Sequence, residues 1–298
     1  MEIFQQIFNL ETFSSTLRMA IPLMVAAIGG MFSERSGVVN IALEGMMLAG
    51  AFIAVVVSYF TGNAWFGLIG AVIFGGLFAL IHAIVSIRYH ANQVVSGVAL
   101  NLLAAGGTVF LLNILFNTSG TSPSVKALPY WGTFKPTVYL GLLIVAISHY
   151  VLFYTPFGLR VRAVGEHPHA ADSVGIDVEK IRYVCVILSG MLAGFAGAHL
   201  SIGVLSVFRE GMTAGRGFIA LAALIFGKWY PFGAMGASLL FGFFQAIEIR
   251  LQGIEAIGIP GEFVQTIPYI LTVIALAGVI GRATPPAASG EPFEKGKR

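Results

Sequence analysis

A carboxylate and an amide lie inside an otherwise apolar stretch of the chain, residues 31–52. Glu44 follows Asn40 by four positions, so both side chains are expected on one face of a helix that starts near Val38. Hydrocarbon penalises a carboxylate by roughly 2.5 kcal/mol or more, so such a residue is rarely without a role. Two interpretations stay open: a polar wall of a solute pathway, or a hydrogen bond that fixes helix packing.

A second set of polar side chains is spread along residues 94–116 and just before them. Asn101 stands eight positions after Gln93, and Thr108 stands seven after Asn101, so the three lie near one stripe of a helix. Amides and hydroxyls suit the hydroxyls of a sugar or the edges of a nucleobase. They equally suit hydrogen bonds between helices, the commoner role of polar residues in membrane helices.

No pattern in the sequence points to catalysis. There is no nucleophile–base pair at a recognisable spacing, no Walker loop and no dinucleotide fingerprint. The six histidines show no metal-site spacing, and Cys185 is the single cysteine, so a Cys-rich metal site and an intrachain disulfide are excluded. We therefore expect a chain that is not an enzyme and binds neither a metal nor a cofactor.

The composition is that of a protein embedded in a membrane. Hydrophobic residues make up 57% of the 298 residues and charged residues 10%, against roughly 25% charged residues in soluble domains. The net charge of +3 is small and gives no indication of a nucleic-acid partner.

Several stretches have the roughly 20 mostly apolar residues that a bilayer crossing needs. One of them is too long for a single crossing and is broken at residues 227–233, which predicts two shorter spans or a re-entrant hairpin. We expect an all-α integral membrane protein with about eight to ten transmembrane helices in residues 1–282, followed by a cytoplasmic tail, residues 283–298. The candidate spans are residues 16–32, 38–60, 65–87, 94–116, 138–154, 182–204, 218–249 and 263–280.

Basic loops predict the orientation, because cytoplasmic loops carry an excess of Lys and Arg. The loop of about residues 155–180 and the tail are both basic, so both are expected in the cytoplasm. Counting crossings then puts residues 33–37 on the same side and the loop 117–137 outside. Lys126 and Lys135 in that outer loop depart mildly from the rule.

The loop of residues 155–180 is long for a compact helical membrane protein. Pro168 can open a short helix and Gly175 can end it. The helix would lie outside the membrane with Ala170, Ala171 and Val174 as an apolar contact edge, and would serve as a docking peg for another protein. An ordinary surface loop is the alternative.

A short motif occurs twice in the chain. Gly-Val-Val-Asn-Ile-Ala-Leu at residues 37–43 resembles Gly-Arg-Gly-Phe-Ile-Ala-Leu at residues 215–221, and each copy follows a pair of charged residues. Five crossings separate the copies, so they would start on opposite faces, which is typical of an inverted repeat around a midplane site. Chance is the alternative, since four matches in seven positions are common in an apolar chain.

Three blocks of sequence resemble one group of transporters. Residues 158–176, beginning Gly-Leu-Arg-Val-Arg-Ala-Val-Gly-Glu, resemble the cytoplasmic loop of bacterial ABC-importer permeases of the branched-chain amino acid and simple-sugar group. Residues 34–52 are similar to the first-span signature of its purine nucleoside branch, and residues 215–229 to a late motif of that branch. The blocks occur in the expected order over most of the chain.

The resemblance implies the ABC importer transmembrane-domain fold and a permease subunit of an ATP-driven importer in the bacterial cytoplasmic (inner) membrane. Its solute would be a nucleoside or a related simple sugar. Its partners would be a second homologous permease, giving a heterodimer, a cytoplasmic ABC ATPase with two nucleotide domains that uses the ATP, and an external substrate-binding lipoprotein. Apart from the resemblance, we infer that the outer Lys126 and Lys135 contact that lipoprotein.

The resemblance also implies roles for individual residues. The segment around residues 165–175 would be the coupling helix seated in the ATPase, with Gly165, Glu166, Ala170, Ala171 and Gly175 as coupling residues. The candidate pathway residues are Asn40, Glu44, Gln93, Asn101 and Phe218. The alternative function is an ion- or proton-coupled secondary carrier with Glu44 as its proton site, which would work without an ATPase. The long docking loop argues against it.

Overall fold

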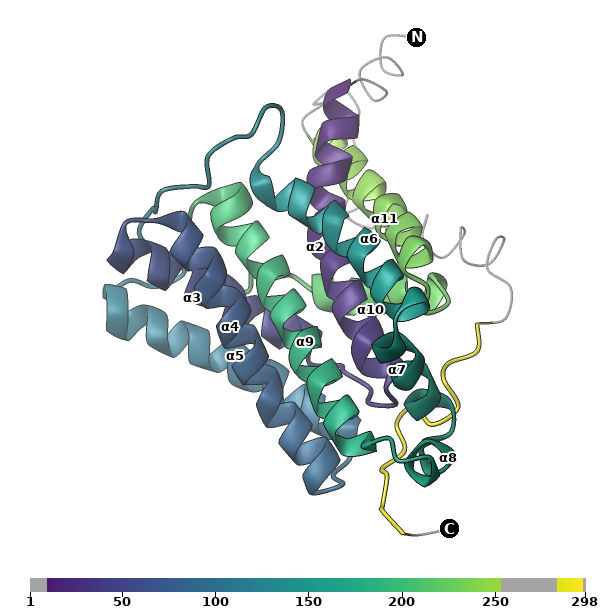
Figure 1. Cartoon of the computed structure of the whole chain (residues 1–298). Coiled ribbons are helices and arrows are strands. Elements are labelled where there is room, and N and C mark those ends of the chain that lie inside the picture. Colours follow the sequence, from purple (N-terminus) through teal and green to yellow (C-terminus); the bar gives the residue numbers. More distant parts are fainter. Residues whose placement is uncertain (1–9, 253–282, 297–298) are drawn as a thin grey trace.

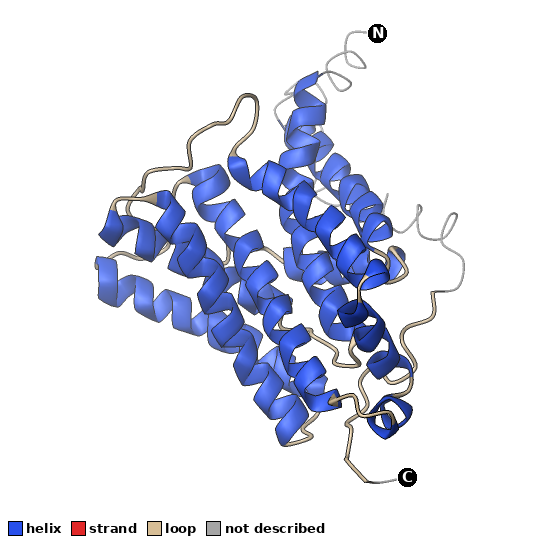
Figure 2. Cartoon of the chain, viewed as in Figure 1, coloured by secondary structure: helices blue, strands red, loops and turns tan. Residues whose placement is uncertain are grey.

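The computed structural model describes residues 10–252 and 283–296, and these form a bundle of helices (Figure 1). Figure 2 shows helices joined by loops in the described part. The long helices are α2 (Leu10–Arg35), α3 (Leu43–Thr61), α4 (Ala64–Ala83), α5 (Gln93–Phe116), α6 (Pro136–Tyr154), α9 (Val178–Ala198) and α11 (Pro231–Gln252). The shorter elements are α7 (Pro156–Glu166), α8 (Pro168–Ser173), α10 (Arg216–Phe226) and the π-helical stretches η1 (Ile84–Arg88) and η2 (His199–Leu205).

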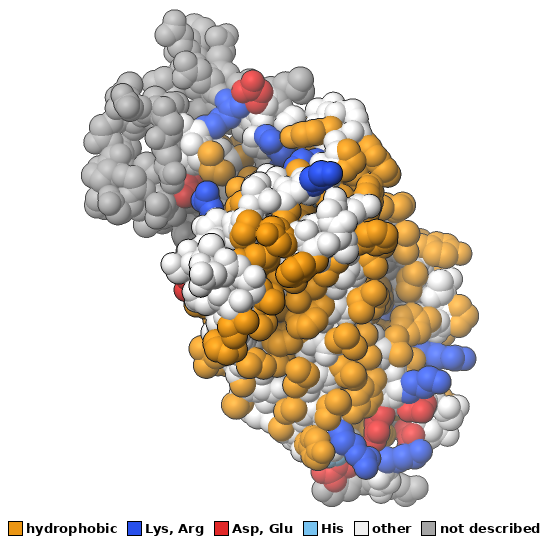
Figure 3. Space-filling model, turned by 90° about the vertical axis from the view of Figure 1, so that its left-hand side faces the viewer, with side chains coloured by type: hydrophobic (Ala, Val, Ile, Leu, Met, Phe, Trp, Pro, Cys, Tyr) orange, Lys and Arg blue, Asp and Glu red, His pale blue; other side chains and the backbone are white. Residues whose placement is uncertain are grey.

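Seven helices in the described ranges are long and apolar enough to cross a membrane. This confirms the all-α membrane fold, while the predicted span at residues 263–280 lies outside the described residues. Side chains are distributed accordingly in Figure 3, where hydrophobic groups cover the middle of the face and charged groups gather toward its two ends.

The predicted break after α10 is confirmed. Helix α10 ends at Phe226 and α11 begins at Pro231. Helix α10 has 11 residues, so it extends about 16 Å, half of the hydrocarbon thickness. It therefore cannot cross a bilayer, and it enters the bundle as a half-length helix.

The predicted start of the second span is wrong. Helix α3 begins at Leu43, and residues 36–42, which we call the re-entrant segment, are not helical. Gly37 has a φ of +92°, which a helix does not allow, and the Asn40 side chain accepts a hydrogen bond from the N–H of Ala42. Such a local side-chain bond competes with helix formation, so the helix starts five residues later than expected.

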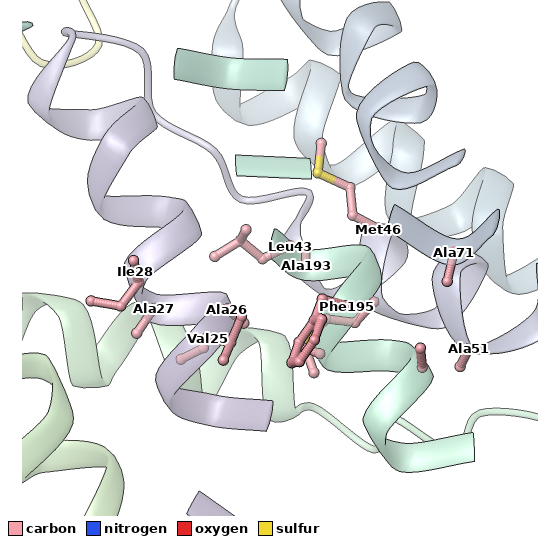
Figure 4. Close-up of a cluster of buried hydrophobic side chains, with 14 of the residues drawn as sticks. Val25, Ala26, Ala27, Ile28, Leu43, Met46, Ala51, Ala71, Ala193 and Phe195 are labelled. Atoms are coloured by element: carbon pink, nitrogen blue, oxygen red, sulfur yellow. The ribbon is translucent and has the colours of Figure 1, made fainter. Parts of the chain in front are cut away.

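Helices α2 and α9 form the antiparallel centre of the bundle. At one end Arg182 of α9 donates from Nε to the carbonyl of Ser36, just after α2, at 3.1 Å. At the other end His199 Nε2 lies 3.1 Å from the carbonyl of Arg18. Figure 4 shows buried side chains of α2, α3, α4 and α9 meeting between these ends, among them Ile28, Leu43, Ala71 and Ala193.

The helices around this centre pack crosswise, as is typical of an inverted repeat. Helices α3 and α4 pack on α9, whereas α10 and α11 pack on α2. The helices that follow α2 in the chain thus pack on α9, and those that follow α9 pack on α2, while α2 and α9 themselves run in opposite directions. Of the two sequence motifs, residues 37–43 precede and enter α3, whereas residues 215–221 cap and begin α10.

The end of the bundle that carries α8, which we call the α8 end, gathers the segments predicted to share the cytoplasmic side. In the C-terminal segment, the N–H of Gly290 donates to the carbonyl of Gly37 at 3.1 Å, and that of Ala288 to the carbonyl of Gly165 at 2.9 Å. Residues 33–37, the region 155–180 and the tail therefore lie together. Lys135, at the end of the loop 117–135, lines a small pocket with Arg18 at the opposite end.

Candidate functional site

The N-termini of α3 and α10 meet inside the bundle in a contact that we call the central junction. Glu44, in the first turn of α3, accepts hydrogen bonds from two backbone N–H groups: Oε1 from Gly215 at 2.8 Å and Oε2 from Gly217 at 2.6 Å. Such N–H groups at a helix start have no internal acceptor, and the helix dipole favours a negative charge there. Glu44 therefore stabilises α10 from the other half of the chain.

Gly217 allows the backbones of α3 and α10 to touch. A Cβ atom at this position would lie 2.4 Å from the Cα of Glu44, so a larger residue cannot fit without moving one helix. The neighbouring Phe218 has an exposed fraction of 49% and lies beside the junction on an open face of the chain. Glu44 itself is half-buried.

Asn101 of α5 stabilises the start of α3. Its Oδ1 accepts from the N–H of Gly45 at 2.7 Å, and its Nδ2 donates to the carbonyl of Ile41 at 3.1 Å. The amide thus satisfies one donor of the helix start and one acceptor of the re-entrant segment. Asn101 is half-buried, so part of its surface stays open.

Val39, in the re-entrant segment, has both of its backbone polar groups satisfied by side chains. The N–H of Val39 donates to Gln93 Oε1 at 2.7 Å, and His82 Nε2 lies 3.0 Å from the carbonyl of Val39. Irregular backbone at membrane depth requires such partners, because hydrocarbon offers none. The predicted stripe on α5 is confirmed for Gln93 and Asn101, and both bind this segment. Thr108 is buried and bonds to its own helix.

The prediction that Asn40 shares a helix face with Glu44 is wrong. Asn40 precedes α3 and is fully buried, and its Nδ2 donates to Ser189 Oγ of α9 at 2.9 Å. Glu44 faces α10 instead. The geometry therefore gives Asn40 a packing contact between the re-entrant segment and α9.

Glu34 and Arg35, the charged pair before the motif at residues 37–43, bind the segment between α10 and α11. Trp229 Nε1 donates to Glu34 Oε2 at 2.6 Å, and Arg35 donates from Nη2 to the carbonyl of Trp229 at 2.8 Å. The Arg35 guanidinium also lies 5.9 Å from the centre of the Phe153 ring. The end of α2 thus fixes the end of the half-length helix.

Gly165 lies in α7, which sequence reasoning treated as loop. A Cβ atom on Gly165 would lie 2.1 Å from the carbonyl oxygen of Arg35, so α7 packs directly on the end of α2. Gly165 is buried there, and its predicted part in coupling stays a prediction. Glu166, the last residue of α7, is exposed, and its Oε2 accepts from the N–H of Ala287 at 3.3 Å.

The predicted short helix at Pro168 is confirmed as α8. Gly175 has a φ of +84°, and its N–H bonds the carbonyl of Asp172 at 2.9 Å, which ends the helix. Ala171 is buried against the bundle, whereas Ala170 is exposed and Val174 has an exposed fraction of 75%. The predicted contact edge is thus divided: Ala171 anchors the helix, and Ala170 and Val174 remain available to a partner.

Lys135 lies at the opposite end of the bundle. Its Nζ is 5.5 Å from the centre of the Tyr130 ring, and it lines the small pocket with Arg18. Burial lowers the pKa of Lys135, and the Arg18 guanidinium lowers it further.

His82, Arg182 and Trp229 take part in these contacts and were missed from the sequence. A single histidine, arginine or tryptophan in an apolar stretch belongs to no spacing pattern from which its partner could be predicted. The break at residues 227–233 was a signal for Trp229. In residues 10–252 and 283–296, no group of three or more His, Cys, Asp or Glu side chains is placed to hold a metal ion.

Residues 12–276 match the family described as "Branched-chain amino acid transport system / permease component". The guanosine ABC transporter permease protein NupQ of Bacillus subtilis (strain 168) is 45% identical over 307 residues, covering 95% of this chain and 96% of NupQ. The nucleoside ABC transporter permease protein NupC of Lactococcus lactis subsp. cremoris (strain MG1363) is 39% identical, covering 93% of this chain and 94% of NupC.

The putative glucose ABC transporter permease protein TsgC13 of Haloferax volcanii is 34% identical, covering 90% of this chain and 91% of TsgC13. The same Bacillus and Lactococcus strains each hold a second, more distant permease, NupP at 27% and NupB at 23% identity. Relatives of this chain therefore occur as pairs within one organism. No solved structure matches the chain.

Proposed function

Since this chain belongs to the family of permease components of branched-chain amino acid transport systems, we propose that it forms part of the translocation pathway of an ATP-driven importer of nucleosides. As a family member it is an ABC transporter permease subunit, not an enzyme. Its apolar helices make it a multi-pass protein of the bacterial cytoplasmic membrane. The observation that carries the nucleoside assignment is the 45% identity to a guanosine permease over nearly the full length of both chains.

The proposed assembly has four kinds of component. The paired relatives support a second, homologous permease beside this chain, in a heterodimer. An ABC ATPase with two nucleotide domains would bind and hydrolyse ATP on the cytoplasmic side, and an external lipoprotein would deliver the substrate. We assign the α8 end to the cytoplasm, with Glu166, Ala170 and Gly175 facing the ATPase directly, while Ala171 and Gly165 hold α8 and α7 in place.

The pathway role is proposed for the open polar and aromatic surface next to the central junction. Glu44 and Asn101 are half-buried and Phe218 is exposed, so these three can face a solute. Asn40 and Gln93 are buried and bonded within the chain, so they would support the pathway wall rather than line it.

Uptake in cells that lack their own nucleoside importers tests the substrate. The chain is expressed with its partner permease, ATPase and lipoprotein, and uptake of radiolabelled guanosine is measured with unlabelled competitors. We expect purine nucleosides to compete at low micromolar concentration and glucose and ribose to have no effect. The similarity to TsgC13 supports the second candidate, a simple sugar, and competition by glucose alone would establish that candidate instead.

A further inference from the structure

The C-terminal segment Pro286–Phe293, which we call the strap, crosses the α8 end without regular secondary structure. The strap contacts the re-entrant segment, where the N–H of Gly290 donates to the carbonyl of Gly37 at 3.1 Å. Arg182 adds a second link, because it donates from Nε to the carbonyl of Ser36 and from Nη1 to the carbonyl of Glu291, at 3.1 and 2.9 Å. The buried Arg182 side chain therefore joins strap and re-entrant segment.

The strap also binds α7 and α8. The N–H of Ala288 donates to the carbonyl of Gly165 at 2.9 Å, and that of Ala287 to Glu166 Oε2 at 3.3 Å. Phe293 is the apolar anchor, with an exposed fraction of 4%, in a cluster with Val164, Ala171 and Val178. Its ring centre lies 5.1 Å from that of His169 at the start of α8.

These contacts make a continuous connection from the surface of the protein to its centre. Phe293 holds α8 through Ala171, and Gly290 holds the re-entrant segment through Gly37. The re-entrant segment leads directly into Glu44, which binds the start of α10. The strap is folded into turns by the bonds from the N–H of Ser289 to the carbonyl of Pro286 and from the N–H of Glu291 to the carbonyl of Ala288. A compact segment bound at both ends links the two sites, so a displacement of α8 pulls on the re-entrant segment.

We propose that the strap passes movement of α8 to the re-entrant segment and so couples ATP hydrolysis to opening at the central junction. This proposal rests on the proposed function, because it takes α8 as the helix that the ATPase moves. Phe293 is then a positioning residue: it touches no substrate and acts through α8.

The test uses the complete transporter in proteoliposomes and measures ATP hydrolysed per guanosine transported. We expect Phe293→Ala to raise this ratio at least threefold, because α8 can then move without the strap. Phe293→Leu, which restores an apolar side chain, should return the ratio to near the wild-type value. Lys295→Ala is the matched control at an exposed position two residues further on, and it should leave the ratio unchanged.

If Phe293→Ala leaves the ATP hydrolysed per guanosine transported unchanged, the strap is not a coupling element. A variant that only lowers the amount of protein in the membrane gives this same result, because the ratio does not depend on that amount. Amide hydrogen exchange at residues 36–42 gives a readout that needs no substrate. We expect faster exchange there in Phe293→Ala, and equal exchange in variant and wild type would overturn the proposal even if the solute is a sugar. Absence of guanosine uptake by the wild-type assembly would instead count against the proposed function.

Discussion

Glu44 binds two halves of the chain together through a single carboxylate. Each of its oxygens accepts one N–H group from the start of α10, at 2.8 and 2.6 Å. Hydrogen bonds to a charged acceptor contribute about 1.5–3 kcal/mol, and a carboxylate at a helix start is additionally favoured by the helix dipole. The carboxylate that first suggested a proton site is thus accounted for by the backbone that it binds.

Two substitutions separate the structural role of Glu44 from a role in proton coupling. Glu44→Gln keeps one acceptor oxygen and should lower the free energy of unfolding by about 1.5–3 kcal/mol, while Glu44→Ala removes both and should cost about 3–6 kcal/mol. We expect Glu44→Gln to retain at least half of the wild-type uptake. Thermal unfolding in detergent and guanosine uptake in cells check the two expectations.

The secondary-carrier alternative predicts the opposite pattern for Glu44→Gln: unchanged thermal stability and no uptake, because the proton site is gone. Unchanged stability together with lost uptake would show that Glu44 does not stabilise the start of α10.

Gly217 sets how closely α3 and α10 approach. Gly217→Ala places a methyl group 2.4 Å from the Cα of Glu44 and should cost about 1–3 kcal/mol through displacement of the helices. Gly236→Ala in α11 is the matched control, since a Cβ there meets no atom within 4 Å and alanine favours a helix. Thermal stability by size-exclusion chromatography after heating compares the two. Equal stability would mean that the two helices are not in contact at this point.

At the scale of elements, α5 is the partner of the re-entrant segment. Gln93 and Asn101 stand on the face toward α3 and satisfy backbone groups of Val39, Ile41 and Gly45. The polar stripe therefore has a structural cause that is independent of any solute: a non-helical segment within the bundle needs donors and acceptors from its neighbours.

Asn101→Ala tests that cause. The variant leaves one N–H and one carbonyl without partners, so we expect a loss of about 1–3 kcal/mol in the free energy of unfolding. Asn113→Ala is the control on the same helix, because Asn113 is exposed and its side chain donates to the carbonyl of Val109 within the helix. Thermal stability and the KM for guanosine are measured for both. A raised KM for guanosine at unchanged thermal stability would show that Asn101 binds the substrate instead.

Val174, directly after α8, is exposed at the end assigned to the ATPase. We expect Val174→Asp to reduce uptake at least tenfold at an unchanged amount of protein in the membrane, because a charge would oppose an apolar contact with a partner. Tyr89→Asp is the control at a residue of nearly equal exposure, 74% against 75%, between η1 and α5. Wild-type uptake by Val174→Asp would show that α8 does not dock on the ATPase through this residue.

At the scale of the whole molecule, the units α2–α4 and α9–α11 share the antiparallel α2–α9 centre, and the starts of α3 and α10 meet at Glu44. Movement of one unit relative to the other would open or close this contact, as alternating access requires. Under the proposed function, the partner ATPase supplies the energy for that movement.

The purified chain alone should therefore not accumulate guanosine in proteoliposomes, with or without a proton gradient. Addition of the partner permease, ATPase, lipoprotein and internal ATP should produce uptake, which is measured by filtration of labelled vesicles. Uptake by the chain alone under a proton gradient would establish the secondary carrier.

The sequence by itself determined the membrane fold, the break between α10 and α11, the helix α8 and the repeated motif. These depend on local properties: runs of apolar residues, a Pro at a helix start and a Gly that ends one. The repeat was readable because both copies keep Gly, Ile, Ala and Leu at the same spacing near the start of a helix.

Only the tertiary structure decided the partners. Asn40, Glu44, Gln93 and Asn101 were all visible as costly polar residues, but each is satisfied by a group between 54 and 173 positions away or on another helix. Gly165 and the C-terminal segment likewise looked independent and proved to be bound to each other. The physical reason is that a polar group in an apolar stretch predicts a hydrogen-bond partner, whereas the packing of the helices decides which group that partner is.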